Sequence, residues 1–126
     1  MMKAIGALAL CGSLLAVPAP AVAAPQSGAT LRILVTVKDA DSKTATLNCY
    51  PAGGTHSSAL QACALLALVG GDPEKLNVNP GAVCTREFRP SAVIITGTWQ
   101  DKPVWFGQMY ANPCQMRAAG GAVFTP

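Results

Sequence analysis

The chain has 126 residues, of which 51% are hydrophobic and only 12% are charged, and its net charge is +3 at pH 7. This length suits one domain and leaves no room for several. The basic residues are scattered rather than gathered into a run, so the sequence gives no support to a nucleic-acid partner.

The first residues are typical of a signal peptide. Met1-Met2-Lys3 is a short basic start, residues 4–17 are almost wholly apolar, and Ala21-Val22-Ala23 offers the small-x-small pattern of a signal-peptidase site. We therefore predict a signal peptide over residues 1–23 and a secreted, extracellular protein with no membrane attachment after cleavage. An uncleaved membrane anchor is the alternative, because the apolar stretch approaches the roughly 20 residues that a span needs. Two prolines that follow the stretch disfavour it.

Removal of such a leader would take Lys3 and Cys11 with it and leave four cysteines, Cys49, Cys63, Cys84 and Cys114. An even number in a small exported domain indicates two disulfides, and spacing alone leaves three pairings open. A zinc site is the alternative. It has little support, because the chain has no C-x-x-C pair and a single histidine, so no metal or other cofactor is expected.

Periodicity predicts the secondary structure. A flexible tail is expected over residues 24–30, before a domain that spans residues 31–126. Alternating apolar and polar residues predict strands, and runs of helix formers ended by glycine predict helices. The predicted strands are 31–38, 44–50, 91–99, 104–111 and 122–125, the predicted helices are 58–69 and 113–119, and a single helical turn is predicted over 72–76.

The helix over residues 58–69 is expected to be largely buried at the centre of the core. Its apolar residues at helical spacing are Leu60, Cys63, Ala64, Ala67 and Leu68, and further aliphatic residues widen that stripe. Pro51-Ala52-Gly53-Gly54 is interpreted as the break that ends the second strand.

The hairpin of residues 91–111 is partly apolar on both faces. One face can pack on the helix, and the other, which carries Trp105 and Met109, lacks a partner within the chain, which suggests a dimer. By residue type alone, Trp99 and Trp105 are both interpreted as core residues.

The most informative stretch is VCTREFRP, residues 83–90. The two ends of this stretch, which we call its shoulders, are both restrained. Pro90 restricts the residue before it to extended backbone at one shoulder, and a disulfide at Cys84 would tie the other shoulder to a second part of the chain. Arg86 lies between these shoulders. A rigid, exposed, extended segment with one arginine is what the substrate cleft of a serine protease accepts, so we interpret the loop as bait for such an enzyme.

A set of short strings, most of them around the cysteines and the loop, resembles the Streptomyces subtilisin inhibitor family of secreted serine protease inhibitors, from about Leu31 to Phe124. Only the combination is specific. The strings are Thr46-Leu47-Asn48-Cys49, Gly54-Thr55-His56, Ala62-Cys63-Ala64, Gly71-Asp72-Pro73, Val83-Cys84-Thr85-Arg86-Glu87-Phe88, Gly97-Thr98-Trp99-Gln100, Ala111-Asn112-Pro113-Cys114 and Ala122-Val123-Phe124.

The resemblance implies an α+β fold, in which the five predicted strands form a single antiparallel sheet with two helices, and a homodimer with one loop in each subunit. It also selects the disulfides Cys49-Cys63 and Cys84-Cys114. The implied scissile bond is Arg86-Glu87, with Arg86 as the primary specificity residue. Val83, Cys84 and Thr85 lie on its acyl side, Glu87 and Phe88 on its leaving side, and Asn112 hydrogen-bonds to the loop from behind.

We therefore expect a substrate-like inhibitor of trypsin-like and subtilisin-like serine endopeptidases, and not an enzyme. The chain departs from the family pattern in two ways. Arg86 replaces the methionine of the best-known member. In addition, Glu87 places an acid next to the scissile bond, and Pro113 follows the supporting asparagine. An enzyme would have to use His56, which lies in a Gly-rich turn, and the chain has no G-x-S-x-G motif. A secreted module that presents its tryptophans to a carbohydrate or a surface is the other alternative.

Overall fold

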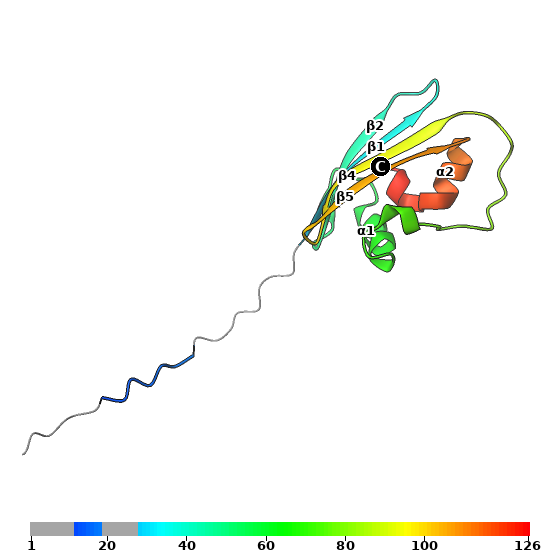
Figure 1. Cartoon of the computed structure of the whole chain (residues 1–126). Coiled ribbons are helices and arrows are strands. Elements are labelled where there is room, and N and C mark those ends of the chain that lie inside the picture. The colour runs from blue at the N-terminus through cyan, green and yellow to red at the C-terminus, as the bar shows by residue number, and fades with distance from the viewer. Residues whose placement is uncertain (1–11, 19–27) are drawn as a thin grey trace, which may run out of the picture.

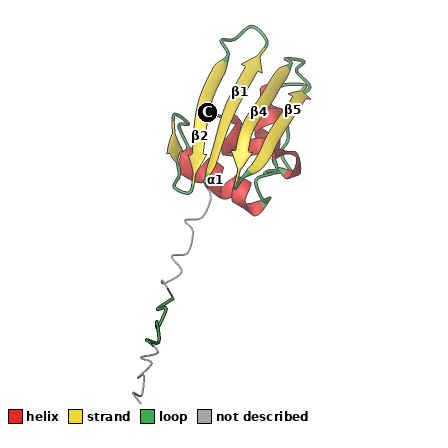
Figure 2. Cartoon of the chain, turned by 60° about the vertical axis from the view of Figure 1, so that its left-hand side comes forward, coloured by secondary structure: helices red, strands yellow, loops and turns green. Residues whose placement is uncertain are grey.

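A single antiparallel sheet with helices on one face makes up the domain (Figures 1 and 2). The computed structural model describes residues 12–18 and 28–126. The strand order is β3-β2-β1-β4-β5. The strands are β1 (Ala29–Val37), β2 (Lys43–Cys49), β3 (Gly53–Gly54), β4 (Ser91–Trp99) and β5 (Lys102–Tyr110); the α-helices are α1 (Ala59–Leu68) and α2 (Pro113–Gly120), and the 3-10 helices are η1 (Pro73–Lys75) and η2 (Gly121–Phe124).

The expected α+β class is confirmed, with five antiparallel strands, two α-helices and the disulfides Cys49-Cys63 and Cys84-Cys114. Strand β1 begins at Ala29, inside the predicted tail of residues 24–30. The predicted signal peptide, residues 1–23, lies outside the described residues except for 12–18 and stays a prediction. In the described ranges, no helix has the length and apolar character needed to cross a bilayer.

Two hairpins and one long-range pairing build the sheet. Strands β4 and β5 are joined by a two-residue turn, Gln100 and Asp101, whose φ angles of 48° and 66° both lie in the left-handed region. Such turns match the right-handed twist of the flanking strands. Strand β1 pairs with its hairpin partner β2 on one side and with β4, distant in sequence, on the other. The loop before β4 is therefore anchored to the middle of the sheet.

The core lies between the sheet and the helices. Alternate residues of the two central strands are fully buried, among them Ile33 and Ile95, which face each other across β1 and β4. Leu66 of α1 and Phe124 of η2 cover them from the helical side, and the Phe124 ring stacks on Phe106 at 5.7 Å between ring centroids. Burial of each such side chain contributes about 1.5–3 kcal/mol to folding.

The prediction of a last strand over residues 122–125 is wrong, because this segment forms η2 instead. Gly120 lies so close to the Phe124 ring that a Cβ there would overlap it. The chain therefore curls after α2 and inserts Val123 and Phe124 into the core. The fifth strand is β3, which pairs with Leu47 and Asn48 of β2 and lies within the segment predicted only to break that strand.

The prediction of a largely buried helix over residues 58–69 is also wrong in part. Helix α1 buries Ala62 and Leu66, whereas Leu60 is 77% and Leu68 is 84% exposed. The helix is apolar on every side, so its spacing cannot tell which face turns inward. The inward face lies beside Cys63, whose disulfide joins the helix to β2.

The two tryptophans lie on opposite faces of the sheet. Trp99 is buried, as predicted, and packs against Gly71. The φ of Gly71 is 78°, which lies in the left-handed region that favours glycine. Trp105 is 76% exposed, so its prediction as a core residue is wrong. It extends over Gly107 on the uncovered face, where Ile94 and Met109 are also exposed.

Candidate functional site

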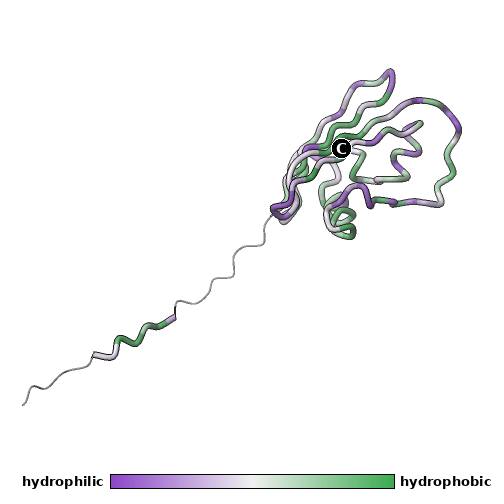
Figure 3. The backbone as a smooth tube through the Cα atoms, in the orientation of Figure 1, coloured by the Kyte–Doolittle hydropathy of each residue, from purple (hydrophilic) through white to green (hydrophobic). Residues whose placement is uncertain are grey.

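The loop before β4 displays two large apolar side chains in solvent. Residues 82–90 have no regular secondary structure and form an arc beyond α2 (Figure 1). Val83 is 98% and Phe88 is 78% exposed, and hydrophobic and hydrophilic residues mix along this arc (Figure 3). Large apolar side chains that stand in solvent on one segment are typical of a binding surface.

A disulfide holds the first shoulder of the loop. Cys84 is bonded to Cys114, the second residue of α2, with 5.7 Å between the two Cα atoms. The bond closes a segment with a sequence separation of 30. On the chain-entropy model such a link stabilises the fold by about 3.5 kcal/mol. It also prevents the loop from moving away from α2.

Asn112 supports the centre of the loop from behind. Its side chain is 1% exposed, and its Nδ2 group donates hydrogen bonds to the carbonyl oxygens of Thr85 at 3.0 Å and Glu87 at 2.9 Å. Its Oδ1 atom accepts from the Gln115 N–H at 2.9 Å and so caps α2. One buried amide thus joins the two sides of Arg86 to the start of a helix.

Pro113 does not disturb this arrangement. It occupies the first position of α2, directly after the capping Asn112. Proline suits this position because its missing N–H has no partner there in any helix and its φ is already helical. Asn112 makes its bonds to the loop with this proline in place.

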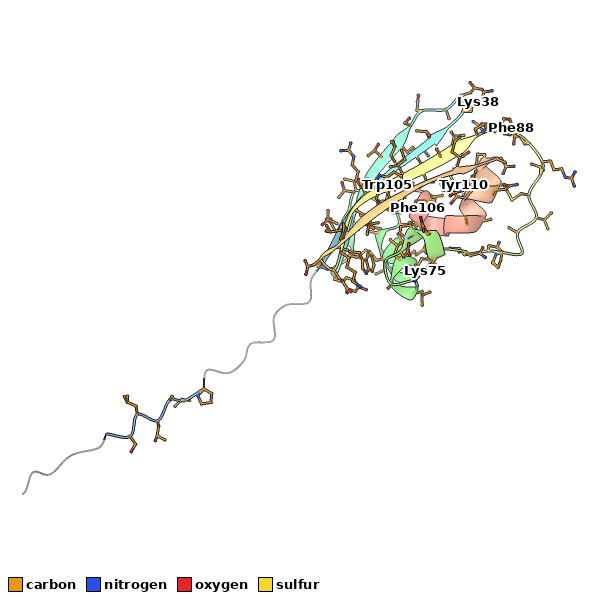
Figure 4. The ribbon with its side chains drawn as sticks, in the orientation of Figure 1. Lys38, Lys75, Phe88, Trp105, Phe106 and Tyr110 are labelled. Carbon is orange, nitrogen blue, oxygen red and sulfur yellow. A yellow bond between two sulfur atoms is a disulfide. The ribbon has the colours of Figure 1, made fainter. Side chains whose placement is uncertain are left out.

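The second shoulder is held by hydrogen bonds alone. The Arg89 N–H donates to the Ala111 carbonyl at 2.7 Å, and the Lys38 N–H donates to the Pro90 carbonyl at 2.9 Å. The Arg89 Nε–H donates to the Lys38 carbonyl at 3.2 Å. Phe88 and Lys38 accordingly lie near one another at one end of the domain (Figure 4). Neither Arg89 nor Lys38 carries a pattern in the sequence that predicts this contact.

Arg86 differs from Arg89 in its surroundings. It is exposed and makes no hydrogen bond or ion pair with any residue that the structure describes, and the same is true of the Glu87 carboxylate. The loop therefore holds its backbone on both sides of Arg86 and leaves the guanidinium free for a partner. A guanidinium can form a bidentate, charge-assisted pair with a carboxylate, which lysine cannot reproduce.

The groups that an enzyme would need are engaged elsewhere. His56 is buried, its Nδ1 atom accepts from the Ser58 N–H at 2.9 Å, and its Nε2 atom lies 3.4 Å from the Val123 carbonyl. All four cysteines in residues 28–126 are paired in disulfides. Within the described ranges no group of three or more His, Cys, Asp and Glu side chains could hold a metal ion. A carbohydrate platform made of both tryptophans is not available, because Trp99 is buried.

Fold and loop together place the protein in the class of small, disulfide-bonded α+β domains that display a constrained peptide on their surface. Comparison with known proteins narrows this class. The chain belongs to the subtilisin inhibitor-like family, whose model matches residues 27–112.

Several relatives share this assignment. The chain is 47% identical over 81 residues to Plasminostreptin from Streptomyces antifibrinolyticus, a match that covers 64% of this chain and 74% of that protein. It is 35% identical over 129 residues to a subtilase-type protease inhibitor from Streptomyces coelicolor, which covers 94% and 90% of the two chains. The family is named for subtilisin inhibitors and the Streptomyces coelicolor relative is named as a protease inhibitor, so the expectation that this chain is not an enzyme is confirmed.

A solved structure shows the same fold. Sermetstatin from Streptomyces caespitosus, in a complex with Bacillus licheniformis subtilisin, aligns with a TM-score of 0.62. The alignment covers 79% of this chain and 100% of sermetstatin, at 23% sequence identity. The arrangement of sheet and helices is therefore shared across a wide divergence in sequence.

Proposed function

We propose that this protein is a secreted, substrate-like inhibitor of serine endopeptidases, and that it binds trypsin-like and subtilisin-like enzymes through the bond between Arg86 and Glu87. The observation that carries the proposal is the bridge made by Asn112 to the carbonyls of Thr85 and Glu87, one on each side of Arg86. Relatives that are themselves named as protease inhibitors support it.

Rigidity explains why such a loop would inhibit rather than be consumed. An ordinary peptide loses about 0.5–1.5 kcal/mol for each side chain that binding immobilises, and a loop already fixed by a disulfide and Asn112 has met that cost during folding. When the bond is cleaved, the two new ends stay beside each other in the active site. Re-formation of the peptide bond then competes with release of the products.

The exposed side chains of the loop supply the contacts. Arg86 would enter a specificity pocket, and an acidic pocket would favour it most. Val83 and Thr85 would occupy enzyme subsites on the acyl side, and Glu87 and Phe88 would do so on the leaving side. Complexes of proteases with protein inhibitors bury about 800 Å² on each partner, and side chains as exposed as Val83 and Phe88 suit such an interface.

Titration against trypsin and subtilisin tests the proposal. We expect residues 24–126 to inhibit both, and Arg86→Asp to abolish inhibition of trypsin while its melting temperature stays unchanged. Arg117→Asp is the matched control, because it makes the same change of charge at an exposed position on α2. Trypsin inhibition by Arg86→Asp equal to that of the unaltered protein would show that the loop is assigned wrongly.

We also propose a homodimer that forms through the uncovered face of the sheet. Ile94, Trp105 and Met109 are 42%, 76% and 66% exposed on this face, which the helices leave open (Figure 2). Burial of such side chains against a second copy would remove apolar surface from water. The loop lies at the end of the sheet, so each subunit would keep its own loop accessible.

Export through a cleaved leader completes the proposal. Two disulfides are typical of proteins that mature in an oxidising compartment. Cleavage after Ala23 would leave four residues before Gly28, where the described domain begins. Determination of the N-terminal residue of the protein recovered from culture medium tests the predicted cleavage position.

A further inference from the structure

The two shoulders of the loop are anchored in different ways. Cys84 lies two residues before Arg86 and is held by a covalent bond to α2. Arg89 lies two residues after Glu87, and every polar group of its backbone is bonded. Its N–H donates to the Ala111 carbonyl at 2.7 Å, and its carbonyl accepts from the Ser91 hydroxyl at 3.0 Å. Ser91 is itself fully buried.

The Arg89 side chain adds a second link to this shoulder. Its Nε–H donates to the Lys38 carbonyl, and the Lys38 N–H in turn donates to the Pro90 carbonyl. The peptide groups on both sides of Lys38 are thus held by consecutive residues of the loop. Lys38 follows directly after β1, the central strand of the sheet, so this pair of bonds ties the leaving side of the loop to the rigid part of the domain.

We propose that Arg89 is a positioning residue on the leaving side of the reactive bond. Its Nε–H bond to Lys38 holds the segment that carries the new amine after cleavage, as the disulfide at Cys84 holds the acyl segment. The inference rests on the proposed function, because it presupposes attack on the bond between Arg86 and Glu87.

The chemistry of cleavage explains what the Arg89 bond to Lys38 contributes. The hydroxyl of the protease serine attacks the Arg86 carbonyl carbon, the bond to the Glu87 nitrogen breaks, and that nitrogen takes the proton and leaves as an amine. If the amine stays in place, it can attack the ester carbon, re-form the peptide bond and return the proton to the serine oxygen. If the amine moves away, water attacks the ester instead and the nicked form accumulates.

The Asn112 bond to the Glu87 carbonyl holds the new end close to its breakage point, but one hydrogen bond leaves the segment free to rotate about it. The bonds at Arg89, two residues further along, restrict that freedom, and the Nε–H bond is the one among them that a change of side chain removes. Pre-organised groups react faster and more favourably than groups that are free to move apart. Loss of the Nε–H bond should therefore shift the balance between the intact and nicked forms toward the nicked one.

Two neutral substitutions separate the hydrogen bond from the charge. In Arg89→Gln the amide nitrogen occupies the same place along the side chain as Nε and can still donate to the Lys38 carbonyl. In Arg89→Met the side chain has similar length but no donor. Both variants lose the positive charge, so any difference between them reports on the hydrogen bond.

The measurement is the equilibrium ratio of nicked to intact inhibitor. Each variant is incubated with a catalytic amount of trypsin, once from the intact form and once from the nicked form, until the two ratios agree. Reduction then separates the fragments for quantification. At equilibrium the enzyme acts only as a catalyst, so a contact between Arg89 and the protease cannot move this ratio. Neither can a loss of stability that affects both forms equally.

We expect Arg89→Met to raise the ratio by about three- to tenfold, as the loss of one hydrogen bond predicts, and to slow the recovery of intact inhibitor from the nicked form. Arg89→Gln should stay within about twofold of the unaltered protein. An unchanged ratio in Arg89→Met, or an equal rise in both variants, overturns the positioning role and leaves the proposed function standing. If the unaltered protein is itself digested without reaching a mixture, the proposed function and this inference fail together.

Discussion

The loop and the body of the domain are stabilised by different forces. The body depends on apolar burial between sheet and helices, with side chains such as Ile33 and Phe124 almost fully enclosed. The loop buries hardly any apolar surface and is held by one disulfide and a few hydrogen bonds. Residues in the body should therefore control stability, and residues in the loop should control binding. Only the anchors between them should affect both.

The largest contrast between an effect on stability and an effect on binding is expected for two phenylalanines. Phe124 is 1% exposed in the core, whereas Phe88 is 78% exposed on the loop. Phe124→Ala should lower the free energy of unfolding by about 3–5 kcal/mol, measured by urea denaturation, and leave inhibition by the folded fraction unchanged. Phe88→Ala should leave stability unchanged and weaken binding to subtilisin. If both variants weaken stability and binding alike, the distinction between loop and body is wrong.

The two disulfides provide the next comparison. The double variant with Cys84→Ser and Cys114→Ser should lose about 3.5 kcal/mol of stability, and the one with Cys49→Ser and Cys63→Ser about 3 kcal/mol. The two losses are close because the stabilisation rises only slowly with the length of the closed segment, and the sequence separations are 30 and 14. Only the first should be digested rapidly by the target protease. Equal susceptibility of the two folded variants would contradict a loop-specific role for the link to α2.

Asn112 belongs to both regions, because it caps α2 and supports the loop. Asn112→Ser keeps a side chain that can cap the helix but removes the two donors to the loop. We expect a loss of about 1–2 kcal/mol in stability and inhibition that fades as the loop is hydrolysed. The measurement is the recovery of protease activity over time at a fixed ratio of inhibitor to enzyme. Persistent inhibition would mean that the two hydrogen bonds are dispensable.

Substitutions on the uncovered face of the sheet should have the smallest effects on the stability of the body and on binding by the loop. Trp105→Glu places a charge on that face and should convert the proposed dimer to monomers, as measured by sedimentation. The melting temperature of the monomer and the inhibition by each loop should change little, because Trp105 lies outside both the core and the loop. A variant that sediments as the unaltered protein does would show that copies of the chain do not meet at this face.

The sequence predicted the strands well because a strand has only two faces. In β4, the alternation of Val93, Ile95 and Trp99 identifies the buried side without further information, and all three are buried. Helix α1 could not be oriented in this way, because it is apolar all round and Leu60 and Leu68 proved exposed. The short segments failed for another reason: two glycines carry no pattern for β3, and residues 122–125 are too few to distinguish a strand from a 3-10 turn.

The candidate site could be anticipated where side-chain chemistry marks it. Cysteines, an arginine and a proline in one stretch predict a constrained loop, and the pairing of Cys84 with Cys114 is confirmed. The role of Arg89 could not be anticipated, because its partner is the backbone carbonyl of Lys38, 51 residues away. Backbone acceptors belong to every residue, so they leave no mark in the sequence.

The insertion of Phe124 beneath the sheet has a practical meaning for handling the protein. Both Val123 and Phe124 are almost fully buried. Proteolysis that removes them would take away a piece of the interior and unfold the domain. Affinity tags and fusion partners are therefore better joined ahead of Gly28, where β1 has not yet begun.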